Sequence, residues 1–192
     1  MRLLPKKRIE PDDFALICET HNWIFHERME NPDSGEARYS WLAQNATVRI
    51  TYVYDPLLNL SYIVTSNSGY AEEPGAVRNV NEELRLAVQE LSAHEALNLF
   101  DQCETDVACQ VKILHLIAAS APEEYNESFF QRFTKAFRNE QVDVRSMALI
   151  ATLYMPWPQI LPVIESLRES DPSVDVRNLA QSIFRDHPMN AH

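Results

Sequence analysis

The chain has 192 residues with 28 acidic and 17 basic side chains, so its formal net charge is −11 at pH 7, and it contains 3 Gly and 11 Pro. A chain of this length can bury a sizeable hydrophobic core and does not need disulfides or a bound metal to fold. The charge argues against nucleic acid as a partner, because affinity for phosphates comes mainly from Lys and Arg, and so few glycines leave no glycine-rich phosphate loop.

In the first part of the chain, apolar residues recur first at the spacing of a short helix and then at every second position. Residues 11–22 begin with a proline and two acids, which favour a helix N-terminus, and continue with apolar residues at helical spacing. Residues 37–44, 47–54 and 58–66 alternate apolar and polar side chains, as half-buried strands do. Residues 23–29 fit a further strand. We therefore expect a helix followed by an antiparallel meander of three or four strands, with the strand aromatics packed against the helix.

From Asn79 onward the pattern is helical, and the helical segments are separated by only a few polar residues or prolines. Connections this short make neighbouring helices antiparallel. Ser92 and Glu95 have the spacing of a capping box. The predicted fold class is an α+β N-terminal part followed by an all-α array of helical hairpins, with residues 1–78 as an α+β cap domain and residues 79–192 as a helical repeat domain.

Two of the helical segments repeat a short motif. The sequences QVDVRSMALIATL and SVDVRNLAQSIF align without gaps, and their D-V-R steps start at Asp143 and Asp175, 32 residues apart. A weaker copy lies 33 residues upstream, with Gln110 and Lys112 where the other copies have Asp and Arg. Each copy follows another amphipathic helix, so the repeating unit is a pair of helices, which is typical of solenoid proteins.

These features resemble HEAT-type repeats, including the short HEAT-like repeats of bacteria. The resemblance depends on the two D-V-R steps at the start of second helices, extends to Pro162 in the first helix of the last unit, and covers residues 92–186. It implies a concave surface that is built from the second helix of each unit, so exposed positions of those helices are where a partner would bind.

We expect the repeated motif, Asp143 and Arg145 with Asp175 and Arg177, to be structural. An Asp that begins a helix caps it and interacts favourably with the helix dipole. The neighbouring Arg can reach the turn or an acid of the adjacent repeat, which makes a charged ladder between units. An exposed ion pair of this kind contributes about 0–1 kcal/mol to the free energy of unfolding.

No residue pattern indicates catalysis, a metal or a cofactor. The six histidines form no H-x-x-x-H or H-E-x-x-H motif, and no pair of carboxylates stands out for acid–base work. We expect His115 to be a packed core residue, and Cys103 and Cys109 to be ordinary thiols in a helical hairpin. The sequence therefore favours a non-catalytic protein without cofactor or metal.

An acidic array of helical repeats favours a module or adaptor that binds another protein, and its negative field would speed association with a basic partner. One specific hypothesis is an immunity-type inhibitor that masks a basic toxin. Trp157 is either a buried plug between repeats or an exposed anchor. The candidate partner-binding residues are Ser146, Leu149, Thr152, Trp157, Asn178, Gln181 and Arg185.

The alternative function is that of a chromophore lyase or chaperone-like protein. Bacterial HEAT-like repeats resemble those of phycobilin lyases, which hold a bilin and its acceptor protein. HEAT-like DNA-repair glycosylases are a third class, but they need a basic groove, and the net charge of −11 argues against one.

The cysteines and the lengths of the apolar segments indicate in which cellular compartment the protein is located. Three cysteines without a C-x-x-C favour the reduced thiols of a cytoplasmic protein. The N-terminal residues lack the apolar stretch of a signal peptide, and no run is long enough to span a membrane. We therefore expect a cytoplasmic protein that binds neither nucleic acid nor membranes.

Overall fold

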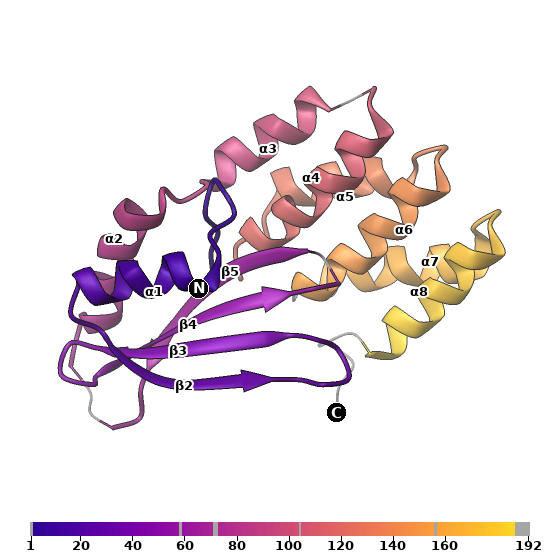
Figure 1. The fold of residues 1–192 in the computed structure, drawn as a ribbon. Helices are drawn as coiled ribbons and strands as arrows, with labels where there is room; N and C mark the ends of the chain where they lie inside the picture. The colour runs from indigo at the N-terminus through magenta and orange to yellow at the C-terminus, as the bar shows by residue number, and fades with distance from the viewer. Residues whose placement is uncertain (1, 58, 71–72, 104, 156, 187–192) are drawn as a thin grey trace. The chain divides into compact units, whose positions relative to one another are not determined.

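The computed structural model describes residues 2–57, 59–70, 73–103, 105–155 and 157–186. The chain divides into two compact units, Met1–Leu91 and Ser92–His192. The first unit contains an antiparallel sheet with two helices, and the second is helical (Figure 1). The predicted fold class, an α+β part followed by a helical-hairpin array, is confirmed.

The sheet is an antiparallel meander with one short added strand. Its spatial order is β1-β5-β4-β3-β2, so β2 forms one edge (Figure 1). The additional strand, β1, has only two residues, which is too short to show an alternating pattern. Leu58, expected at the start of the last strand, lies outside the described residues. The strands are β1 (Arg2–Leu3), β2 (Ile24–Glu30), β3 (Ala37–Ala43), β4 (Val48–Asp55) and β5 (Leu60–Asn67).

One face of this sheet packs against α1 (Pro11–Thr20) and α2 (Ala76–Val88). Phe14 of α1 is fully buried, and its ring lies edge-on to Trp41 at 5.2 Å between centroids. The hydroxyl of Tyr52 donates a hydrogen bond of 2.8 Å to the carbonyl of Ile9, which satisfies a polar group beneath the helix layer. Most strand aromatics therefore pack against helices as expected, but Phe25 on the edge strand does not, because more than half of its side chain is exposed.

The first unit extends beyond the boundary expected after residue 78. Val80, Leu84 and Val88 of α2 belong to the same buried cluster as the sheet. Since these side chains complete the core of the first unit, α2 belongs with the sheet, and the boundary between the units lies between Leu91 and Ser92.

The second unit consists of three helical hairpins in succession (Figure 1). Each helix contacts its hairpin partner, and the second helices of successive hairpins also contact one another. The hairpins are α3 (Ala93–Gln102) with α4 (Val107–Ser120), α5 (Glu127–Phe137) with α6 (Val142–Ala151), and α7 (Leu161–Ser170) with α8 (Val174–Asp186). Two short 3-10 segments, η1 (Thr152–Tyr154) and η2 (Pro158–Ile160), connect α6 to α7.

Side-chain caps explain where several helices start. Ser92 and Glu95 form the predicted capping box of α3. Asp106 caps α4 and Asn126 caps α5, each by accepting hydrogen bonds from backbone amides of the first turn. Pro162 lies in the first turn of α7, where a missing amide hydrogen costs no intrahelical bond, so it favours the helix start instead of kinking the interior.

Candidate interaction surface

The predicted partner-binding residues fall into two groups. Asn178, Gln181 and Arg185 of α8 are exposed, and Ser146 of α6 is half-buried. These four side chains lie on second helices as predicted, and solvent reaches all of them. Their character is polar with one cation, so they add no acidic charge to the helical unit.

Leu149 and Thr152, which were expected to be exposed, are fully buried. The prediction of exposure is wrong for both because α6 is the central second helix, with α4, α5 and α8 all packed against it. Thr152 also donates its hydroxyl hydrogen to the carbonyl of Leu149 at 2.6 Å. Neither side chain is available to a partner.

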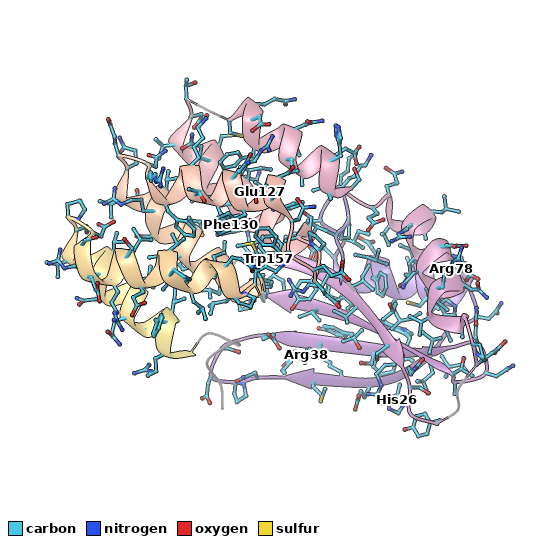
Figure 2. All side chains as sticks on the ribbon, turned by 180° about the vertical axis from the view of Figure 1, so that it is seen from behind. His26, Arg38, Arg78, Glu127, Phe130 and Trp157 are labelled. Carbon is cyan, nitrogen blue, oxygen red and sulfur yellow. A yellow bond between two sulfur atoms is a disulfide. The ribbon has the colours of Figure 1, made fainter. Side chains whose placement is uncertain are left out.

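Trp157 is a buried plug between hairpins, which rules out the alternative of an exposed anchor. Its side chain is 1% exposed, and the indole Nε1–H donates to the carbonyl of Pro122 at 3.1 Å. The ring of Tyr125 lies edge-on at 5.7 Å and that of Phe129 at 6.3 Å. Trp157 is labelled among the helices of the second unit in Figure 2.

Of the two repeated arginines, Arg145 makes the expected contact with the next hairpin, in a buried setting, and Arg177 contacts the turn of its own hairpin. Arg145 forms a bidentate pair with Asp171 in the α7–α8 turn, and it also donates to the carbonyls of Asn139 and Glu140 in its own turn. Arg177 donates to the backbone carbonyl of Asp171 at 2.5 Å. The expectation of an exposed pair is therefore wrong, and these arginines are structural.

The aspartates of the motif do not play the expected capping role on α6. The N-cap of α6 is Gln141, without a side-chain cap, and Asp143 is an exposed residue of the first turn. Asp175 occupies the equivalent place in α8. Both carboxylates lie where the positive end of the helix dipole favours them. In the first copy, Gln110 accepts a hydrogen bond of 3.1 Å from Asn139, which links the first two hairpins without charge.

Two open grooves lie between successive turns of the helical unit. One of 630 Å³ runs from the α3–α4 turn to the α5–α6 turn, and one of 790 Å³ runs from there to the α7–α8 turn. Arg138, Asn139 and Glu140 line both grooves. Their charges are mixed, and no nucleophile with an adjacent base lines either groove, so we assign no chemistry to them.

The described residues contain no group of three or more His, Cys, Asp or Glu side chains that could hold a metal ion. His115 is half-buried and contacts the sulfur of Met147 on the next hairpin, as expected for a packed residue. The expectation of ordinary thiols is wrong for Cys103 and Cys109, which form a disulfide across the α3–α4 turn. The turn brings their Cα atoms to 5.4 Å, a normal spacing for a disulfide.

A concentrated surface of one charge lies in the first unit. Residues 10–36 carry eight acidic residues and a single basic residue, Arg28, so they account for −7 of the net −11. Most of these acids are exposed, and we call the exposed set the acidic α1–β2 surface. Its members are Glu10, Asp12, Asp13, Glu19, Glu30 and Asp33.

Ring contacts and charges join α1 to β2 on one side of the sheet. Trp41 of β3 contacts Phe14 of α1 at 5.2 Å and Phe25 of β2 at 5.6 Å. The pKa of Arg28 is raised above its ordinary value, mainly by its hydrogen bond to Glu30 and by the charge of Glu30, with a smaller effect from the charge of Asp12 on α1. The ring contacts of Trp41 therefore connect α1 to the edge strand.

Some of these acids are neutralised locally and others are not. Arg49 donates to Glu27 at 2.5 Å, and Arg28 pairs with Glu30. Glu10 pairs with Arg8, and Glu36 pairs with Arg38. For the described part of the chain, no ion pair involves the remaining exposed carboxylates of this segment. These are Asp12, Asp13, Glu19 and Asp33, which give the surface its uncompensated charge.

The same edge strand also exposes large apolar side chains. The exposed fractions are 71% for Ile24, 55% for Phe25 and 50% for Met29. Three such residues within one strand of seven are unusual on an edge, since exposed apolar edges invite association with other chains. Phe25 lies on the face of the sheet that α1 covers, whereas Ile24 and Met29 lie on the opposite face, so exposed apolar side chains flank the edge on both sides.

No protein-family model, characterised protein or solved structure matched the chain in the comparisons. None of the helices within the described ranges has the length and apolar character needed to cross a membrane. The sequence predictions placed the binding site on the second helices and missed the acidic α1–β2 surface. The signal that would have found it is the count of eight acids against one base in residues 10–36.

Proposed function

We propose that the protein is a non-catalytic interaction module whose acidic α1–β2 surface binds a basic protein. The observation that carries the proposal is the concentration of −7 of the net −11 in residues 10–36, next to the exposed Ile24, Phe25 and Met29. A surface of one sign speeds encounter with a partner of the opposite sign, and apolar contacts then slow dissociation.

In this proposal the second unit is a HEAT-like array that serves as a rigid scaffold. Two observations support that role. Second helices contact one another in chain order, as in stacked repeats, and the Arg145–Asp171 pair links one hairpin to the next. Asn178, Gln181 and Arg185 of α8 remain exposed for secondary contacts. An immunity-type inhibitor of a basic toxin is the specific form of the module that the acidic charge favours.

A cytoplasmic location belongs to the same proposal, and Cys18 is the residue that supports it, since a buried free thiol suits a reducing compartment. In that compartment the Cys103–Cys109 disulfide would be reduced and would form only on oxidation. Rapid acid quenching of intact cells, followed by alkylation of the unfolded chain and counting of its blocked thiols, tests this. Three blocked thiols support a cytoplasmic location, and one contradicts it.

The binding proposal is tested by capture from native lysate with three forms of the protein. The first is the wild type. The second is a neutralised variant, Asp12→Asn, Asp13→Asn, Glu19→Gln and Asp33→Asn. The third is a matched control with the same change of charge in the other unit, Glu124→Gln, Glu140→Gln, Asp143→Asn and Asp175→Asn.

We expect the wild type and the matched control to capture the same basic protein, and the neutralised variant to capture at least tenfold less of it. Raising the salt concentration from 50 mM to 500 mM should release the captured protein, because surface charge pairs are screened at high ionic strength. Equal capture by all three forms, capture of an acidic protein, or no capture would each contradict the proposal.

A further inference from the structure

The free edge of β2 is the feature of the acidic α1–β2 surface that the proposed function leaves unused. Among the described strands only β3 pairs with β2, so the backbone donors and acceptors of its outer edge face no strand (Figure 1). An extended segment can add to such an edge through main-chain hydrogen bonds, while its alternate side chains give specificity. The length of β2, seven residues, is enough for such pairing.

A second copy of the chain is a poor occupant for this edge. Two identical antiparallel strands must pair about a two-fold axis, so each charge meets a charge of its own kind near the centre. With Glu27 or His26 on that axis, the segments of −7 would face each other. This repulsion between like charges opposes self-association and favours an occupant of opposite charge.

Both faces of the edge carry apolar side chains and a carboxylate. Phe25, Arg28 and Glu30 lie on the face that α1 covers, because they pair with Trp41, Tyr39 and Ala37, and Trp41 also contacts Phe14 of α1. Ile24, Glu27 and Met29 lie on the opposite face, where they pair with Leu42, Ser40 and Arg38. A docked strand would therefore meet exposed apolar side chains on both faces, within a segment that has an excess of acidic residues.

We propose that β2 accepts an extended segment of a partner protein as a sixth strand, and that this segment combines Lys or Arg with apolar residues. The inference deepens the proposed function and rests on it, since it names how the basic partner is held. The main-chain bonds hold the segment in an extended conformation, and its apolar side chains distinguish it from other cationic chains.

The test uses a ten-residue peptide of alternating Lys and Val with blocked ends as the probe. We expect the backbone amide resonances of residues 24–30 to shift on titration, and their outward-facing amides to exchange with solvent at least tenfold more slowly at saturation. A peptide of alternating Lys and Pro is the control, because it carries the same charge and cannot donate main-chain hydrogen bonds from its prolines.

Two variants at one position distinguish the contribution of the β2 backbone to peptide binding from that of the side chain. His26, labelled in Figure 2, is the bulged residue and has no partner on β3. His26→Pro places a proline in the edge strand at the position of β2 without a partner on β3, where its ring obstructs an added strand, and it should weaken binding of the Lys–Val peptide at least tenfold. His26→Ala keeps the amide and should bind like the wild type. The amide spectra of both variants show whether the sheet is intact.

Three outcomes would overturn the inference. Equal binding of the two peptides would mean that charge alone holds them, which leaves the proposed function standing. Binding of the Lys–Val peptide without slowed exchange in residues 24–30, or no binding at low salt, would place no strand on this edge. A dimer that protects the same amides without peptide would make a second copy the occupant. Strand addition by the peptide together with failed capture from lysate would instead contradict the proposed function.

Discussion

Arg145 and Asp171 form a bidentate ion pair between the second and third hairpins, with Nε to Oδ2 at 2.7 Å and Nη2 to Oδ1 at 2.9 Å. The two side chains are 7% and 2% exposed. The pair is stabilising only as a unit, because removal of one partner leaves a buried charge without compensation.

The first prediction concerns this pair. Arg145→Met and Asp171→Leu should each lower the free energy of unfolding by about 3–5 kcal/mol, as measured by urea denaturation. The double variant should cost less than the sum of the single variants. Arg78→Met is the matched control, since its pair with Glu82 is exposed and should contribute about 0–1 kcal/mol. Equal losses for Arg145→Met and the control would contradict the buried-pair assignment.

The pH dependence of stability provides a second prediction. Burial acts to raise the pKa of Asp171, but hydrogen bonds from Arg145 and from the backbone amide of Ser173, with the charges of Arg145 and Arg177, outweigh it and lower that pKa. A carboxyl whose pKa is lower in the folded state stabilises the fold at all pH values above its unfolded pKa, about 3.9. That stabilisation disappears as pH falls through the folded-state pKa.

The difference in free energy of unfolding between the wild type and Asp171→Asn should therefore be constant from about pH 5 to 8 and shrink below about pH 4. Urea denaturation at a series of pH values measures it. A difference that persists unchanged down to pH 2, or one that grows, would show that the ionised carboxylate does not carry the effect.

The repeat pattern predicted the architecture of the second unit and only part of its chemistry. The D-V-R steps indicated that Arg145 would reach the next hairpin, which it does. They did not identify Asp171 as the partner, because that residue lies in a turn outside the motif and becomes a neighbour only when the hairpins stack. Leu149 was placed on the surface because helical periodicity gives the position of a residue around one helix, not the number of helices packed around it.

The edge strand shows a similar limit. Alternation predicted residues 23–29 as a strand but could not show whether that strand is central or at an edge, since sheet order depends on long-range pairing. Phe25 was therefore expected in the core, and the structure exposes it. The clustering of acids in residues 10–36 was present in the sequence, but only the fold shows that α1 and the edge strand contribute to one surface.

A third prediction concerns Trp157. Trp157→Ala should lower the free energy of unfolding by about 3–5 kcal/mol, because it removes a large buried ring. Trp157→Phe keeps an aromatic ring but loses the hydrogen bond to the Pro122 carbonyl, so its cost should be smaller, about 1–3 kcal/mol. Urea denaturation compares the two variants. A cost near zero for Trp157→Ala would contradict the buried position.

The last prediction concerns the thiols. Burial raises the pKa of the Cys18 thiol to about 12, and Cys103 is bonded to Cys109. Protein purified without reductant should therefore show no reactive thiol when native at pH 8, because only the thiolate reacts. It should show one thiol per chain when unfolded, and three when unfolded and reduced. Three thiols in the unfolded, unreduced protein would contradict the disulfide. The double variant Cys103→Ser and Cys109→Ser should unfold with about 2 kcal/mol less free energy, as expected for the opening of a short loop, and should still show one thiol when unfolded.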